Sequence, residues 1–261
     1  MSEKVDFTFS FWRNHFKSLI SAILVIAGPF VLLGGGISGY FSSEVLFGVN
    51  QITATFSSLI GVLFTSIGGM FVLYYTLLYV KVFLETNEVP TFKILWERKE
   101  EVGLGNMLLS MLGLSVILLF GFLFLIIPGV YMSVVFSLLL PVMVFEKKSF
   151  NNALSRSSFL IKENWWSSFG FYFAIGTVAG IIGVVVNSVP NMFMIFGASQ
   201  QVDGGELPFY FQPLIILLTM VASLIAFMIN TVNYVALAVN YFSLLEDKEA
   251  VSLKDEILTM E

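Results

Sequence analysis

The positions of lysine and arginine relative to six apolar segments constrain this chain more than any other feature. The segments cover roughly residues 18–40, 52–84, 104–127, 129–145, 167–189 and 213–245. All 13 Lys and Arg residues lie before the first segment or at and beyond the ends of the second, fourth and sixth. Loops rich in positive charge stay in the cytoplasm. We therefore expect six membrane crossings, with both termini in the cytoplasm.

Composition supports helices in lipid. The chain is 57% hydrophobic and 12% charged, whereas soluble domains contain about 25% charged residues. About 20 apolar residues are needed for a helix to cross a hydrocarbon core of about 30 Å. The pattern predicts an all-α fold, a six-transmembrane-helix bundle built of three hairpins. The absence of cysteine excludes disulfides and thiolate chemistry.

Glycine and proline mark irregular points in these segments. The second and sixth segments exceed one crossing, so we expect them to tilt, kink or project. The glycines at 34–36, 61, 68 and 69 predict either bends or close helix packing. Pro128-Gly129 predicts a tight external turn. Residues 190–212 are expected to form the longest external segment, as a lid or as an ordinary surface loop.

Three short aromatic and basic stretches precede the odd-numbered segments. They cover about 7–17, 91–101 and 149–164, and in each the apolar residues recur at helical spacings of three and four. We expect three cytoplasmic interfacial amphipathic helices lying in the headgroup layer, with their basic side toward anionic lipid. The residues predicted to contact lipids or a partner are Trp12, Arg13, Lys17, Lys81, Trp96, Arg156, Trp165 and Trp166.

Residues 127–169 hold the most specific segment of the chain. It reads Ile-Pro-Gly-Val-Tyr from residue 127, then Pro141 and Glu146, and ends with Asn164-Trp165-Trp166. This segment resembles a signature of bacterial multi-pass inner-membrane proteins, among them the membrane domain of glycerophosphoryl diester phosphodiesterases and its stand-alone relatives. The resemblance implies an inner-membrane location and an architectural role for Pro128, Gly129, Pro141 and Glu146. In the fused proteins hydrolysis belongs to a separate soluble domain, so no catalytic residue is carried over.

Polar residues inside the apolar segments are few. Asn230, Asn233 and Asn240 lie in the last segment and predict either a polar pathway or interhelical hydrogen bonds worth about 0.6 kcal/mol each. Lys81 lies inside an apolar run, where it could bind a lipid phosphate or extend to the cytoplasmic interface. The single histidine, His15, is expected on the polar side of the first interfacial helix.

These patterns predict a membrane protein that is not an enzyme. No catalytic set or metal-ligand cluster is evident, so we expect no cofactor and no metal. The leading hypothesis is a scaffold or accessory subunit of an inner-membrane complex, which contacts membrane lipids and a membrane-protein partner or a second copy, and not nucleic acid. The alternative is a transporter or channel for a lipid or small amphiphile. A polar groove from Lys81 past Tyr75 toward Asn233 would favour that alternative.

Overall fold

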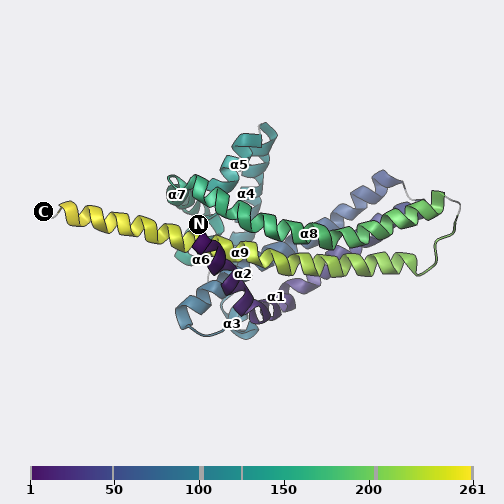
Figure 1. The fold of residues 1–261 in the computed structure, drawn as a ribbon, viewed down its shortest axis with the longest axis horizontal. Helices are drawn as coiled ribbons and strands as arrows, with labels where there is room; N and C mark the ends of the chain where they lie inside the picture. Colours follow the sequence, from purple (N-terminus) through teal and green to yellow (C-terminus); the bar gives the residue numbers. More distant parts are fainter. Residues whose placement is uncertain (1, 49, 100–102, 125, 203–204, 260–261) are drawn as a thin grey trace. The chain divides into compact units, whose positions relative to one another are not determined.

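In the computed structural model every described element is a helix (Figure 1). The structure describes residues 2–48, 50–99, 103–124, 126–202 and 205–259. Over these residues the predicted all-α fold is confirmed. The elements are α1 (Ser2–Glu44), the 3-10 helix η1 (Val45–Phe47), α2 (Gln51–Thr86), α3 (Phe92–Glu97), α4 (Leu104–Phe124), α5 (Ile126–Val135), α6 (Leu139–Glu146), α7 (Phe150–Ile161), α8 (Trp165–Val202) and α9 (Phe211–Thr259).

Six helical segments of the described chain are long and apolar enough to cross a membrane. They are Ser2–Phe47, Gln51–Thr86, Gly105–Leu123, Ile126–Glu146, Trp165–Gln201 and Phe211–Ala250. Large apolar side chains on them face outward; Phe56, Leu123 and Val184 are 69%, 71% and 71% exposed. Such surfaces are rare in soluble monomers and ordinary in lipid. The chain is a multi-pass membrane protein.

Several helices run further than the sequence predicts. Residues 7–17 form the first turns of α1 rather than a separate helix, because no proline or glycine interrupts the chain between them and the apolar run that follows. Residues 190–202 belong to α8, so the expected long external segment is wrong over that stretch. The helix accommodates Pro190 with the loss of one backbone hydrogen bond, because proline has no N–H group.

Helix α3 is shorter than predicted. It covers only Phe92–Glu97 of the predicted 91–101, whose last two residues lie outside the described part.

The predicted helix over 129–145 is two helices, α5 and α6, separated by a turn at residues 136–138. In an unbroken helix the backbone nitrogen of residue 141 would donate to the carbonyl of Ser137. Pro141 has no N–H, so that bond cannot form. Pro141 instead occupies the first turn of α6, where a missing N–H costs nothing.

The predicted turn at Pro128-Gly129 also differs from the structure, because both residues lie in the first turn of α5. Gly129 has a packing role there. A Cβ at this position would lie 2.5 Å from the ring of Phe122 on α4. The glycine therefore allows α4 and α5 to approach closely.

The helices gather into two compact units. The first unit comprises Met1–Leu19, Tyr74–Gly176 and Val232–Glu261. The second unit comprises Ile20–Leu73 and Thr177–Thr231. The long helices α1, α2, α8 and α9 each contribute one part to each unit.

Small residues hold the second unit together. A Cβ on Gly34 would lie 2.3 Å from Thr65 Oγ1 and 2.7 Å from the carbonyl oxygen of Gly61. A Cβ on Gly61 would lie 2.2 Å from Ser38 Oγ. The contacts thus repeat at a four-residue spacing on both α1 and α2, which is the pattern of close helix pairs in membranes. Of the two alternatives for these glycines, the structure shows packing.

A second set of small residues joins α1 to α9 within the same unit. A Cβ on Gly35 would lie 2.7 Å from Ser223 Oγ, and one on Gly39 would lie 3.0 Å from Thr219. Both pairs again differ by four residues along each helix. Helix α1 therefore packs closely on α2 with one face and on α9 with another.

We predict that Gly61→Ala destabilises the protein by about 1–3 kcal/mol, because the added methyl group meets Ser38 and backbone atoms that cannot move aside. Gly69→Ala is the matched control, since a Cβ at Gly69 meets nothing within 4 Å. The measurement is reversible unfolding of both variants in mixed micelles. Equal stability of the two variants would contradict the packing account.

Candidate functional site

The first unit contains a buried polar network centred on Asn240 of α9. Its Nδ2 atom donates to Ser168 Oγ at 3.1 Å and to Tyr172 Oη at 2.9 Å. Lys4 Nζ donates to Asn240 Oδ1 at 3.5 Å, and Ser137 Oγ donates to Tyr172 Oη at 3.1 Å. One amide therefore connects α1, α8 and α9, and Tyr172 extends the network to the turn between α5 and α6. For Asn240 the structure favours interhelical hydrogen bonding over a polar pathway.

The carboxylate of Glu146 forms a second polar centre at the end of α6. Its side chain is only 16% exposed. It accepts hydrogen bonds from Arg156 Nε at 2.9 Å, Lys148 Nζ at 2.6 Å and Tyr241 Oη at 3.0 Å. These bonds tie α6 to α7 and α9. Arg156, predicted to contact lipid or a partner, thus pairs within the chain, because a buried carboxylate needs charged donors.

Lys81 lies inside the first unit rather than at its surface. It is 6% exposed, and its Nζ donates to the carbonyl oxygen of Val144 at 2.9 Å. Val144 is in the last turn of α6, where carbonyl groups lack helical partners and favour a cation. The predicted lipid contact of Lys81 is wrong for this reason. Tyr75 is also buried, at 0% exposed, so no exposed polar groove exists at these two positions.

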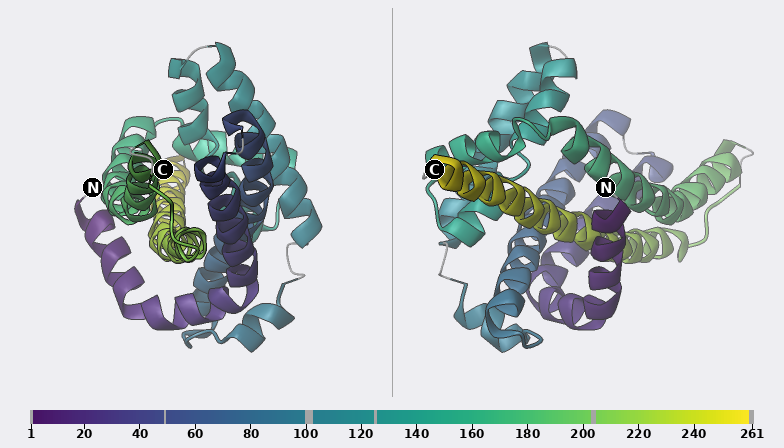
Figure 2. Two further views of the ribbon diagram at one scale, coloured as in Figure 1. Left: turned by 90° about the vertical axis from the view of Figure 1, so that its right-hand side faces the viewer. Right: turned by 60° about the vertical axis from the view of Figure 1, so that its left-hand side comes forward.

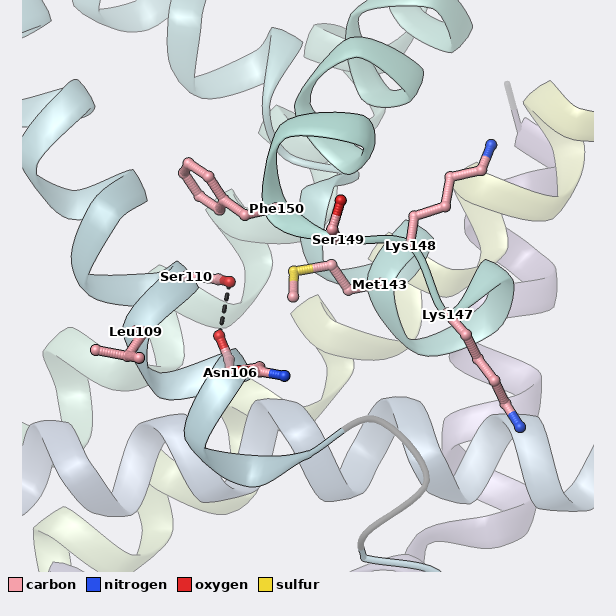
Figure 3. Close-up of a pocket in the computed structure, with 8 residues that line it drawn as sticks. All are labelled: Asn106, Leu109, Ser110, Met143, Lys147, Lys148, Ser149 and Phe150. Carbon is pink, nitrogen blue, oxygen red and sulfur yellow. Dashed lines mark hydrogen bonds between the residues drawn. The ribbon is translucent and has the colours of Figure 1, made fainter.

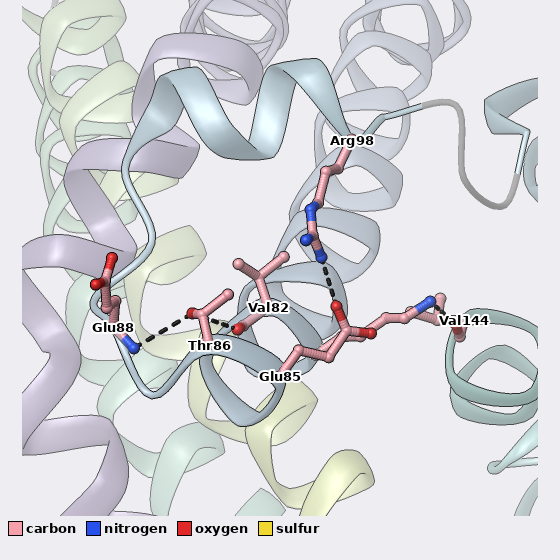
Figure 4. Close-up of polar contacts among 7 residues, drawn as sticks. Val82, Glu85, Thr86, Glu88, Arg98 and Val144 are labelled. Atoms are coloured by element: carbon pink, nitrogen blue, oxygen red, sulfur yellow. Dashed lines mark hydrogen bonds and ion pairs between the residues drawn. The ribbon is translucent and has the colours of Figure 1, made fainter.

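Polar contacts also tie α3 to the end of α2 (Figure 4). The guanidinium of Arg98 pairs with the carboxylate of Glu85. Tyr74 Oη donates to the carbonyl oxygen of Lys99 at 2.7 Å. The Lys99 ammonium lies 3.8 Å from the ring centroid of Trp96, which is 45% exposed. Trp96 is therefore held at the surface by its contact with Lys99.

His15 packs within the first unit instead of lying on a polar face. Its Nδ1 is 3.2 Å from Tyr79 Oη, and Ser18 Oγ is 2.6 Å from the same hydroxyl. Its ring stacks on Phe11 at 4.4 Å between centroids. Of the predicted surface residues nearby, Arg13 and Lys17 are exposed and Trp12 is half-buried.

A cavity of about 370 Å³ lies between α5, α8 and α9 in the first unit. Asn233 and Tyr234 of α9 line it, together with Tyr172 of α8 and Ser133 and Ser137. The rest of its wall is apolar. Of the three asparagines of the last predicted segment, Asn233 lines this cavity. Asn230, in the second unit, is exposed and donates to the carbonyl of Ala226 in its own helix at 2.8 Å.

A second cavity, of about 540 Å³, adjoins the first and shares Val130 and Phe169 with it. Its further lining comes from both ends of the predicted signature: Ile126, Ile127, Tyr131, Lys162, Glu163, Trp165 and Trp166. We call the two adjoining cavities the α5–α8 cleft. The cleft was not predicted, since its lining comes from segments assigned to opposite sides of the membrane.

The two tryptophans at the start of α8 differ in role. Trp165 Nε1 donates to the carbonyl oxygen of Tyr131 at 3.3 Å, and its ring stacks on Tyr131 and Phe169 at 5.6 and 5.2 Å. Trp165 is therefore part of the packing between α5 and α8. Trp166 is 78% exposed at the mouth of the cleft.

A third cavity, of about 560 Å³, lies between α4 and the segment that joins α6 to α7 (Figure 3). Asn106, Ser110 and Ser149 line it beside apolar side chains. Lys147 and Lys148 also line it, but Figure 3 shows their ammonium groups directed away from its centre. Lys148 pairs with the carboxylate of Glu146. The lysines therefore give this cavity no anion-binding centre.

Lys248 of α9 pairs with Glu163, beside the cleft. The hydrogen bond from this ammonium lowers the pKa of the Glu163 carboxyl below its ordinary value. The pair thus stabilises the fold at neutral pH, and this contribution is lost as the pH falls through that lowered pKa.

Comparison with family models, curated proteins and solved structures gives no match to this chain. The resemblance of residues 127–169 therefore stays a prediction. Among the described residues, no group of three or more His, Cys, Asp or Glu side chains is placed to hold a metal ion.

We predict that Glu146→Ala destabilises the protein by about 1–3 kcal/mol, because it removes the carboxylate that accepts hydrogen bonds from three donors and leaves Arg156 without that partner. Glu97→Ala is the control. The Lys93–Glu97 pair is 84% and 63% exposed, and such pairs contribute at most about 1 kcal/mol. Unfolding in mixed micelles checks both variants, and an equal effect would argue against the polar centre.

Proposed function

We propose that this protein binds a membrane amphiphile in the α5–α8 cleft, as a non-enzymatic multi-pass protein of a bacterial inner membrane. The observation that supports this most is the cleft itself, whose cavities of about 370 and 540 Å³ adjoin at Val130 and Phe169. Sites for small ligands are commonly concave, mostly apolar and about 300–1,000 Å³ in volume, with a few polar groups that orient the ligand. The inner-membrane location follows from the resemblance of residues 127–169.

The distribution of polar groups along the cleft suits an amphiphile. Lys162 and Trp166 lie at the mouth and are both exposed. Phe169 and Val130 form an apolar middle, and Asn233 lines the inner cavity. A headgroup would meet the ammonium and the indole ring, side chains favoured at the membrane interface. The hydrocarbon chain would lie against the aromatic wall.

Binding is a better account than hydrolysis because the serine hydroxyl groups in the cleft are already engaged in hydrogen bonds. Ser133 Oγ donates to the carbonyl of Val130 at 2.8 Å. Ser137 Oγ contacts both the Val134 carbonyl and Tyr172 Oη. The single histidine of the chain packs against Phe11 and Tyr79 and does not line the cleft. A serine activated by a base therefore finds no support here.

A scaffold or accessory subunit is the second candidate, supported by the exposed rings of Trp96 and Trp166. Exposed tryptophans are common anchors of protein interfaces. Since Trp165 is packed inside the first unit, a test of this candidate uses Trp96→Ala and Trp166→Ala. We expect these changes to release a partner if the protein is a scaffold, with folding unchanged.

The cleft is tested by purification in a mild detergent, followed by native mass spectrometry. We predict that about one amphiphile molecule co-purifies with each chain. We expect at least tenfold less of it with Val130→Trp, because the larger side chain occupies space in both cavities that Val130 lines. Val116→Trp is the control, since Val116 is 52% exposed on α4. Equal retention in both variants would rule out the cleft, and a stoichiometric protein partner without an amphiphile would favour the scaffold.

A further inference from the structure

The hairpin of α4 and α5 lies beside the junction of α7 and α8. Ser157 Oγ of α7 donates to the carbonyl oxygen of Val135 at 2.6 Å. Eight residues later in the chain, Trp165 Nε1 donates to the carbonyl oxygen of Tyr131, which lies four residues before Val135, at 3.3 Å. The two segments therefore run in opposite directions along each other. The order of these contacts brings the first residues of α5 to the end of α7.

The remaining contacts agree with this order. Ile126 and Ile127, next to the tip of the hairpin, line the same cavity as Lys162. At the other end of α7, Phe150 Cζ lies 3.2 Å from the position of a Cβ on Gly113, in the middle of α4. Helix α7 has 12 residues, about 18 Å of helix, so it follows the outer half of the hairpin.

This arrangement conflicts with two full crossings by residues 104–127 and 129–145. Those crossings would place Ile127 about 30 Å from the membrane surface at which Glu146 and α7 lie. The charge pattern assigns Lys162 to that same surface as Glu146. Yet Lys162 and Ile127 line one cavity. Length and hydropathy allow the hairpin to cross, but its packing opposes it.

The orientation of the hairpin supports the same conclusion. Figures 1 and 2 show that α4 and α5 stand across, and not along, the first turns of α8 and the part of α9 in the same unit. The outer face of α4 is apolar and exposed, with Leu109, Leu119 and Leu123 at 68%, 63% and 71%. An apolar face of this size needs lipid or protein to cover it.

Helix α7 cannot serve as the membrane anchor by its own apolar face. Its buried residues, among them Ala153, Leu160 and Ile161, belong to the side that packs within the unit. The exposed Lys162 next to it instead places a positive charge in the same cavity lining as Ile126 and Ile127. Apolar surface beside a basic group matches one leaflet that contains anionic headgroups.

We infer that the α4–α5 hairpin does not cross the bilayer and lies in one leaflet, with its tip on the same membrane surface as Lys162. The chain then crosses four times, through α1, α2, α8 and α9. Residues 103–145 contain no charged side chain, so the charge pattern is the same for a hairpin that crosses and for one that returns. This inference is independent of amphiphile binding.

Single cysteines test it without background, because the chain has none. Ile127, at the tip of the hairpin, is 82% exposed, and Ile127→Cys is the test position. Ser155 on α7 is also exposed, and Ser155→Cys marks the membrane surface at which α7 lies. Phe209→Cys, 92% exposed in the loop before α9, marks the surface that the charge pattern assigns to the other side. We expect a membrane-impermeant maleimide to label Ile127→Cys and Ser155→Cys from the same side of sealed vesicles. Labelling of Ile127→Cys from the side of Phe209→Cys would overturn the inference.

A second measurement decides the case in which lipid shields Ile127→Cys from the reagent. A short membrane-permeant bismaleimide, much shorter than the hydrocarbon core of about 30 Å, should bridge Ile127→Cys to Lys162→Cys in membranes. The exposed pair Lys93→Cys and Glu97→Cys, one helical turn apart, is the positive control for bridging. Bridging of the control pair without bridging of the test pair would contradict the inference.

Discussion

The carboxylate of Glu146 is the interaction on which the first unit depends most. It accepts hydrogen bonds from Arg156, Lys148 and Tyr241, and so joins the end of α6 to the middle of α7 and to α9. The neighbouring residue on α9, Asn240, extends the same support to Ser168 and Tyr172 of α8. A charge of low exposure in an apolar protein is unfavourable unless it is paired in this way. These two adjacent positions of α9 therefore connect it to the end of α6 and to the first turns of α8.

The α5–α8 cleft is a consequence of that placement. The break caused by Pro141 turns α5 away from α6, and the polar centre at Glu146 keeps α6 close to α9. Trp165 then bridges α5 and α8 from the side of the mouth. The space left between α5, α8 and α9 is lined by apolar side chains and by a few hydroxyl and amide groups. An amphiphile has the matching division into apolar and polar parts.

Much of the fold could be predicted from the sequence, because continuous apolar runs leave helices as the structure that satisfies their backbone in lipid. The break before Pro141 was also predictable, since proline cannot donate to Ser137. The small residues at Gly34 and Gly61 suggested close packing, but their spacing alone did not name the partner helices. The role of Glu146 was predicted only as architectural, with no partner named.

Other features depended on contacts between distant residues. The sequence could not show that Lys81 meets the end of α6, because an ammonium at the edge of an apolar run suits an interface equally well. Nor could it place Ile127 beside Lys162, since an uncharged hairpin leaves no sign of its direction. Asn230, Asn233 and Asn240 look alike in the sequence. The structure gives them three different surroundings: an exposed helix face, a cavity wall and a buried network.

The most direct test of the amphiphile-binding account is a cryo-electron microscopy map of the protein in nanodiscs made from its native lipids. The account predicts elongated non-protein density along Val130 and Phe169, with its polar end at Lys162 and Trp166. A cleft that is closed by side chains, or open without such density while neighbouring lipids are resolved, would contradict it.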